Sequence, residues 1–378
     1  MSSIFMEDIK DCSIIKIKDS VDLFLNDDHY LMVYYMNTRQ RKSFRINDSM
    51  VNLLQTIDGK KSVKEIVDIM LNEHEVEEEQ TRSVIEMLYS HKILTPVMTE
   101  QSFLTAEEVD RYTRQINYFS EFSGSEIDGL KAQKKLFDSH IAVFGCGAVG
   151  GNIAVQLAMA GVGSFTLYDD DFVEVSDAAR HIYYDENSIG EKKVNALKRE
   201  LLSINSKINV ETVDNYMHPD SDVNSIITDS DFIINTLDEP YIGYTSAKIS
   251  RLCVKHNKPH YIAGGFDAHL ASTGELIIPY ITPCVECYAS HFKVALKDWK
   301  PKKHPVIDRF RDIGGLASMS LFSSSFASIE IVKYLTGITD INQSFKIRGE
   351  FLFHDMSLKY LNLRKDPDCK VCGKGAPE

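Results

Sequence analysis

The sequence predicts an α/β fold: a doubly wound, mostly parallel sheet of Rossmann type, preceded by a small winged-helix-like α+β domain. Residues 141–152 (IAVFGCGAVGGN) read as a buried strand that turns through glycines into a helix. Strand and helix patterns alternate after this point, which is typical of a parallel sheet covered by helices. Short β-prone runs followed by helix patterns set residues 1–98 apart from residues 99–378.

The composition limits the classes of function. The chain has 378 residues, 43% of them hydrophobic, enough for about two domains. A formal net charge of −13 argues against nucleic-acid binding, which needs a basic face, and against a polybasic membrane anchor. Charged residues interrupt the N-terminus where a signal peptide is apolar, and no apolar run approaches the roughly 18 residues of a membrane span. We therefore expect a soluble, cytoplasmic protein that binds neither nucleic acid nor a membrane.

The N-terminal region begins with β-prone segments and continues with helices. The segments are residues 13–19, 22–25, 29–36 and 42–46. Three helix patterns follow, and the second starts with a predicted capping box, in which Ser62 is the N-cap and Glu65 its partner. This order of elements predicts a small winged-helix-like module.

A helical connector over residues 99–138 leads to the alternating elements of the large domain. Strands are predicted near residues 141–145, 165–171, 208–215, 231–238 and 260–265. Helices are predicted from about Asn152 to Ala160 and from Glu191 to Ile204. Residues 274–282 and 351–364 predict further β-structure, and the small-residue-rich segment 319–337 predicts a buried helix.

The glycine loop is the first candidate binding site. Gly145, Gly147 and Gly150 fit G-x-G-x-x-G, and Asp169 follows the next strand 22 residues after Gly147. Glycines allow a phosphate to approach the backbone, and the acidic residue suits a ribose hydroxyl. NAD, FAD and ATP proteins share this pattern, so taken alone it leaves the nucleotide open.

Charged residues around this loop favour ATP over NAD. Cationic candidates are Arg114, Arg180 and Lys193, and Asp238 ends a predicted strand at the carboxyl edge of the sheet. Cations neutralise charge on a reacting phosphate, and a carboxylate can hold Mg²⁺. An NAD enzyme would need a hydride-handling residue in their place. Asp171 is a further candidate contact, with a surface ion pair as its alternative.

Four of the seven cysteines form two C-x-x-C pairs, Cys284/Cys287 and Cys369/Cys372. In a reducing compartment such pairs bind metal more often than they form disulfides. Four thiolates brought together by the fold would make a closed, structural Zn²⁺ site. The alternative is two redox-active pairs. Cys146 and Cys253 are expected to be buried small hydrophobes.

Taken together, these motifs resemble the E1-like adenylating enzymes, the group that includes MoeB, ThiF and the ubiquitin activators. The resemblance extends from Arg111 to Gly373 and includes R-Y-x-R-Q, the glycine loop, the strand-end aspartate and both C-x-x-C pairs. It implies that Asp169 holds the ATP ribose and that Arg180 and Lys193 contact the phosphates. It further implies that Asp238 binds Mg²⁺ and that Arg114 reaches across a homodimer into the partner's site.

The sequence departs from that family pattern in two ways. The usual Asn-x-x-Arg-Gln is here Asp177-Ala178-Ala179-Arg180-His181, which adds an acid beside the expected triphosphate. Residues 288–318 contain no cysteine, so the thioester step of sulfur-carrier and ubiquitin activation is expected to be absent.

Residues 57–96 resemble the PqqD-like element that recognises leader peptides, on the motif D-G-K and its spacing to K-I-L. Its implied role is to add a leader as an extra strand, at an edge expected in residues 29–36 or 42–46. A purely structural module is the alternative.

An adenylating domain joined to this element resembles the MccB-type and, more closely, the PaaA-type peptide-modifying enzymes. The implied function is ATP-dependent activation of a carboxyl group in a ribosomal precursor peptide, followed by cyclisation or dehydration in antibiotic biosynthesis. A non-catalytic peptide-binding scaffold and an NAD-dependent oxidoreductase are the alternatives. Basic residues could receive an acidic peptide or form a solvated loop; they are Lys297, Lys300, Lys302, Lys303, Arg309 and Arg311.

Overall fold

The computed structural model describes residues 9–26, 29–97, 104–123, 126–238, 242–267, 270–295, 315–340 and 345–373. The chain forms two compact units, Met1–Lys134 and Lys135–Glu378. Helix α4 (Ala106–Ser123) and most of α5 (Glu126–Asp138) belong to the first unit. This division therefore lies further along the chain than the predicted domain boundary, and the assignment of residues 1–98 to a separate functional domain stays a proposal.

Antiparallel strands open the first unit. β2 (Val21–Leu25), β3 (Tyr30–Tyr35) and β4 (Gln40–Arg45) form a sheet in that order. β1 (Ile15–Ile17) pairs with β5 (Leu94–Pro96). The predicted edge strand at residues 42–46 is confirmed by β4. The other predicted edge, residues 29–36, is wrong, because β3 is hydrogen-bonded on both sides.

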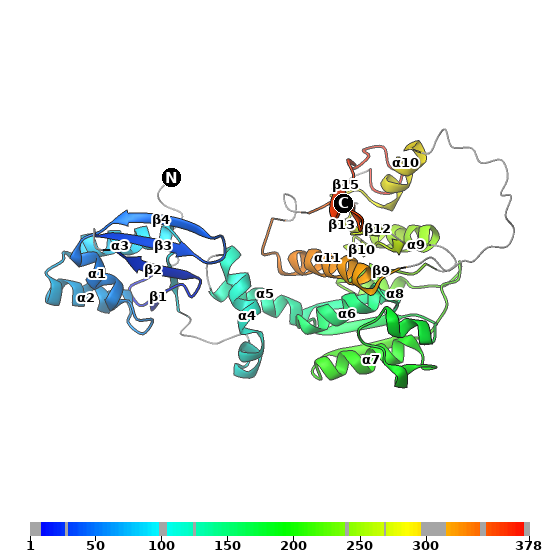
Figure 1. The fold of residues 1–378 in the computed structure, drawn as a ribbon, viewed down its shortest axis with the longest axis horizontal. Helices are drawn as coiled ribbons and strands as arrows, with labels where there is room; N and C mark the ends of the chain where they lie inside the picture. Colours follow the sequence, from blue (N-terminus) through cyan, green and yellow to red (C-terminus); the bar gives the residue numbers. More distant parts are fainter. Residues whose placement is uncertain are drawn as a thin grey trace. The chain divides into compact units, whose positions relative to one another are not determined.

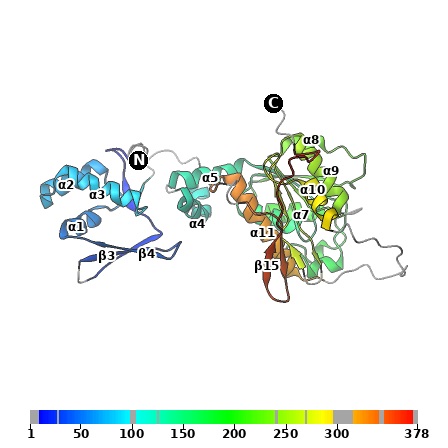
Figure 2. The same cartoon turned by 90° about the horizontal axis from the view of Figure 1, so that it is seen from above.

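Three helices lie together on one face of this sheet (Figure 2). They are α1 (Asp48–Thr56), α2 (Val63–His74) and α3 (Glu78–Ser90). The predicted capping box of α2 is confirmed: Glu65 N donates to Ser62 Oγ over 3.2 Å, and Ser62 N donates to a Glu65 carboxylate oxygen over 2.7 Å. The helices and strands share one apolar core that includes Val33, Ile66 and Leu88.

The main sheet of the second unit has six strands in the order β13-β10-β9-β6-β7-β8. The strands are β6 (His140–Phe144), β7 (Ser164–Tyr168), β8 (Asn209–Val213), β9 (Phe232–Asn235), β10 (His260–Ile262) and β13 (Glu275–Ile277). All neighbours are parallel except β13, which pairs antiparallel with β10. The predicted doubly wound, mostly parallel sheet is confirmed.

Helices and a second sheet complete this unit (Figure 1). The helices are α6 (Gly150–Met159), α7 (Lys193–Ile204), α8 (Asn224–Asp229), α9 (Ile242–Lys255), α10 (Val285–Ala295) and α11 (Ala317–Thr336). The second sheet is antiparallel, in the order β11 (Phe266–Asp267), β12 (Leu270–Ser272), β14 (Gly349–Leu352) and β15 (Ser357–Tyr360). The predicted small-residue helix is α11, which packs on α6 through buried serines; Ser324 Oγ donates to Val149 O.

The strand order reverses at β6. The chain passes from β6 to β7 and β8 on one side of it, and then returns to β9 and β10 on the other. Thr236, directly after β9, donates its N–H to Phe144 O at the end of β6 over 2.7 Å. In open α/β sheets, ligands bind outside the carboxyl ends of the strands at such a switch point.

Candidate active site

Each of the three motif glycines stands at its position for a different structural reason. Gly145 has φ +96°, and a Cβ there would lie 2.3 Å from Thr236 Oγ1. A Cβ on Gly150, at the start of α6, would lie 2.0 Å from Gly145 O. A Cβ on Gly147 would meet no protein atom within 4 Å. The loop is thus tightly packed at both ends and open in the middle, at the switch point, where a phosphate would need to approach the backbone.

Asp169 joins the glycine loop to the segment after β7. It is 6% exposed, and its carboxylate accepts hydrogen bonds from Cys146 N over 2.6 Å and from Asp171 N over 2.8 Å. Burial raises the pKa of Asp169, although these two backbone donors act in the opposite direction. The carboxylate keeps lone pairs free for a further donor such as a ribose hydroxyl.

The predicted phosphate-binding cations lie in one charged cluster. Lys193 Nζ lies 2.9 Å from Asp171 Oδ2 and 3.9 Å from Asp177 Oδ2. Arg180 Nη2 lies 2.9 Å from Asp177 Oδ1. Burial lowers the pKa of Lys193, but the hydrogen bond to Asp171 and nearby carboxylates outweigh it, so the pKa is raised. Lys193 is therefore protonated at neutral pH.

Asp177, the departure from the family pattern, is a buried residue of this cluster with a 2% exposed side chain. Besides Arg180, it accepts a hydrogen bond from Glu174 N over 3.0 Å, which caps the short 3₁₀ helix Val175–Ala179. The extra acid is thus neutralised by protein cations in this structure.

Two tyrosine hydroxyls contact backbone carbonyls of the glycine loop, and the sequence analysis did not identify these tyrosines. Tyr183 Oη lies within hydrogen-bond distance of the carbonyls of Cys146 and Gly147, at 3.2 and 3.0 Å. Tyr184 Oη lies 3.1 Å from Cys146 O and 3.0 Å from Lys193 O. One hydroxyl therefore links the loop to the start of α7. The adjacent pair of tyrosines after Arg180 was the available signal in the sequence.

Among the described residues, Asp238 makes no hydrogen bond or ion pair with this cluster. Asp238 is exposed three positions after β9, at the same edge of the sheet as the loop, and residues 239–241 lie outside the described part. Arg114 is exposed on α4 in the first unit. Magnesium binding by Asp238 and the action of Arg114 across a dimer stay predictions. The predicted peptide-receiving residues between Lys297 and Arg311 also lie outside the described residues.

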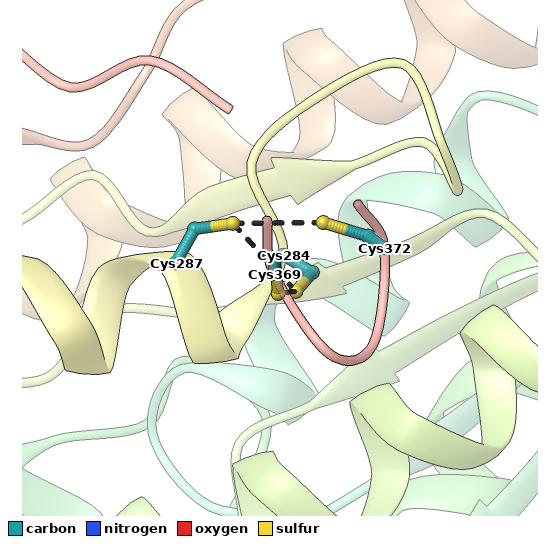
Figure 3. Close-up of side chains that lie close together, drawn as sticks. All are labelled: Cys284, Cys287, Cys369 and Cys372. Atoms are coloured by element: carbon teal, nitrogen blue, oxygen red, sulfur yellow. Dashed lines mark hydrogen bonds between the residues drawn. The ribbon is translucent and has the colours of Figure 1, made fainter. Parts of the chain in front are cut away.

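The four paired cysteines converge. Cys284 and Cys287 lie at the start of α10, Cys369 and Cys372 lie in the C-terminal segment, and their sulfurs turn toward one another (Figure 3). The Sγ–Sγ distances are 4.0 Å for Cys284–Cys287, 3.7 Å for Cys284–Cys369 and 3.5 Å for Cys287–Cys372. All four sulfurs lie within 4.8 Å of one another. A tetrahedron with Zn–S bonds of about 2.3 Å requires Sγ–Sγ distances of about 3.8 Å, whereas a disulfide requires about 2.05 Å. The geometry therefore fits a four-thiolate metal site.

This fold and this site define a class of protein: a nucleotide-binding α/β protein with an open glycine loop, a cationic cluster beside it and a four-cysteine cluster. The model of the ThiF family matches residues 112–371, so the chain belongs to the ThiF family. Within the described residues, no helix has both the length and the apolar character needed to cross a membrane.

The relatives include enzymes. The vegetative HesA protein of Trichormus variabilis is 30% identical over 275 residues, which cover 71% of this chain and 91% of HesA. The adenylyltransferase and sulfurtransferase UBA4 of Scheffersomyces stipitis is 28% identical over 313 residues, 79% of this chain and 65% of UBA4. Adenylyltransferases among the homologues indicate that this chain is an enzyme.

Solved structures extend the similarity in fold to nearly the whole chain. Escherichia coli MccB superposes with a TM-score of 0.71 at 19% identity, over 96% of this chain and 98% of MccB. PaaA superposes with a TM-score of 0.70 at 23% identity, over 92% of this chain and 100% of PaaA. At these identities the likeness shows the fold.

Proposed function

We propose that the chain is an ATP-dependent adenylating enzyme that activates a carboxyl group of a ribosomally made precursor peptide. The observation that supports this function best is the open space at Gly147, at the switch point of the sheet and joined through Tyr184 to the start of α7, where Lys193 lies. A triphosphate placed there would find backbone N–H groups and protonated side chains.

The proposed reaction begins with activation of the carboxylate. A carboxylate oxygen of the peptide attacks the α-phosphorus of ATP, the bond to the bridging oxygen breaks, and pyrophosphate leaves. The product is an acyl-adenylate. Lys193 and Arg180 would offset the charge that builds on the phosphates, and Asp169 would hold the ribose. Asp238 would supply a carboxylate ligand to Mg²⁺, which neutralises phosphate charge when bound.

The second step would use a nucleophile of the peptide itself. Residues 288–318 lack a cysteine. Outside the four-cysteine cluster the chain has Cys12, which is exposed, and Cys146 and Cys253, which are buried as predicted. Burial raises the pKa of both buried thiols, so neither is a ready nucleophile. Attack of a peptide group on the acyl-adenylate releases AMP and closes a ring, with a net loss of one water.

The N-terminal unit would supply the peptide. β4 is an edge strand whose residues Arg41, Lys42 and Arg45 are exposed, so it can pair with an added strand and favours one that carries acidic residues. The structures of MccB include complexes with the peptide MccA, and this likeness supports a peptide partner here. A homodimer, in which Arg114 completes the partner's ATP site, is part of the same proposal.

The test is to mix the purified chain with Mg-ATP and with candidate small peptides translated from the reading frames next to its gene. We expect formation of AMP and pyrophosphate that depends on the peptide, and a peptide lighter by one or more waters in the mass spectrum. Peptide binding without AMP formation would instead identify a non-catalytic scaffold.

A further inference from the structure

A polar cavity of about 340 Å³ lies in the first unit. Each lining residue that the structure describes has a charged or hydrogen-bonding side chain, and the alkyl and aromatic parts of these side chains form much of the wall. The lining residues discussed below are Lys16, Lys18, Asp19, Thr95, Arg114 and Glu121. Its volume falls in the range of small-molecule sites, about 300–1,000 Å³.

Two secondary-structure elements direct these side chains into the cavity. Lys16 and Lys18 are two residues apart on an extended segment, so they project from the same side of it. Lys16 is also the cross-strand partner of Thr95 in the β1–β5 pair. On α4, Arg114, Asn117, Tyr118 and Glu121 follow the spacing i, i+3, i+4 and i+7, which puts them on one face of the helix. The cavity thus has a wall from each element.

Lys18 is the unusual residue of this cavity. It is 7% exposed, and its backbone is fixed by hydrogen bonds to Ile93 and Val21. In the part of the chain that the structure describes, its ammonium makes no hydrogen bond and no ion pair, whereas Lys16 is paired with Asp19 at 3.0 Å. Burial lowers the pKa of Lys18, although Glu121 acts in the opposite direction. Keeping a lysine mostly buried without a charge partner costs free energy, which an anionic ligand would offset.

The charges of the lining residues indicate what charge a ligand of this cavity should have. Among the lining residues that the structure describes, Asp19 is paired with Lys16, and Lys18 and Arg114 face one further carboxylate, that of Glu121. One excess positive charge suits a monoanion better than a dianionic phosphate, which Glu121 would repel. The neutral Asn, Ser, Thr and Tyr groups of the lining can hydrogen-bond the rest of a polar molecule.

We propose that this cavity binds a carboxylate-bearing ligand about the size of an amino acid, with Lys18 as the charge partner of the carboxylate. The carboxylate belongs either to a free amino acid or to an acidic side chain of a peptide. The proposal concerns binding alone, and the cavity shares Arg114 with the proposed ATP site of a dimer. Arg114 is left unchanged in the test, because it is also proposed to act at the ATP site of a partner.

Calorimetric titration of the full chain tests this site with three probes: L-glutamate, N-acetyl-L-glutamic acid α-amide and inorganic phosphate. We expect saturable, millimolar or tighter binding of at least one of the two carboxylates. Preference for free glutamate would identify an amino-acid ligand, and preference for the blocked compound would identify a peptide side chain. Absence of saturable binding of both carboxylates, or tighter binding of phosphate, would overturn the proposal.

Two variants test whether the carboxylate binds in this cavity. Lys18→Met should weaken it about tenfold or more, since a charge-assisted hydrogen bond is lost, while Lys64→Met, at an exposed lysine of α2, should not change it. Glu121→Gln should tighten it, because a competing carboxylate is removed; this variant serves if Lys18→Met does not fold. Unchanged affinity in Lys18→Met, or unchanged or weaker affinity in Glu121→Gln, would contradict the assignment.

Discussion

Replacement of Gly147 by alanine separates the two possible roles of the glycine loop, folding and phosphate binding. Gly147 has no positive φ, and a Cβ on it would meet no protein atom within 4 Å. Gly147→Ala should therefore fold normally and, by reducing the freedom of the unfolded chain, gain about 0.4–1 kcal/mol. The added methyl group would lie in the space that we assign to a phosphate, so we expect ATP affinity to fall by about tenfold or more.

The expected size of the effect can be worked out. At a concentration of ATP a hundred times its Kd, binding stabilises the native state by about 2.7 kcal/mol, which raises Tm by roughly 5–10 °C for a domain of this size. A tenfold weaker Kd at the same concentration leaves about 1.4 kcal/mol. The Tm increase produced by Mg-ATP should therefore fall by about half in Gly147→Ala, whereas the Tm without ligand stays level or rises slightly.

Thermal unfolding with Mg-ATP, with NAD and without ligand provides the assay, and Gly150→Ala is the matched control. Its Cβ would lie 2.0 Å from Gly145 O, so this variant should lose stability outright, by about 3 kcal/mol or more. If Mg-ATP stabilises Gly147→Ala as much as the original chain, the open space is not the phosphate site. Equal stabilisation by NAD would overturn the choice of ATP.

Three further predictions concern the metal sites and the peptide site. Asp238→Asn should abolish peptide-dependent AMP formation and leave Tm unchanged, because an exposed carboxylate is lost; near-normal turnover would exclude Asp238 as the magnesium ligand. Metal analysis of freshly purified protein should find one zinc per chain, and Cys369→Ser should lose the zinc and destabilise the C-terminal segment; metal-free protein of full stability would refute this site. The variants Arg41→Pro and Lys42→Pro each remove one backbone N–H from β4. N–H directions alternate along an antiparallel strand, so one of the two N–H groups points away from β3. The variant that loses this N–H should stay folded and bind a labelled precursor peptide more weakly in fluorescence anisotropy; unchanged affinity in both would mean that β4 does not hold the leader.

Local rules were enough to predict several elements of this chain. The Ser62–Glu65 capping box, the glycine loop after a buried strand and the serine-rich buried helix each depend on residues close in sequence, and the structure has all three. The edge strand could not be decided in the same way. β3 and β4 have similar strand patterns, and only their pairing shows that β3 is central. The division of the chain after residue 134 depends likewise on how α4 and α5 pack.

In the candidate site, contacts between single side chains likewise could not be predicted from the sequence. The sequence analysis named Lys193 and Arg180 and also Asp171 and Asp177, but it did not show that these carboxylates hold the two cations. Arg180 and Asp177 are three residues apart, whereas the contact of Lys193 with Asp171 joins separate segments, and the fold decides which side chains meet. The tyrosines behind the glycine loop were missed for the same reason: their hydroxyls contact backbone carbonyls, which carry no signal in the sequence.

The pairing of Arg180 with Asp177 is compatible with phosphate binding by the same arginine. A guanidinium has five N–H donors. Nη2 of Arg180 donates to Asp177 over 2.9 Å and to Ser176 Oγ over 3.4 Å, while the Arg180 side chain remains 45% exposed. A phosphate can thus bind Arg180 without breaking its contact with Asp177. The family's asparagine could also accept this hydrogen bond through its amide oxygen, so the aspartate changes the charge of the cluster more than its geometry. Because Asp177 is buried and already faces two cations, its negative charge mainly orients Arg180 and Lys193 before a nucleotide binds.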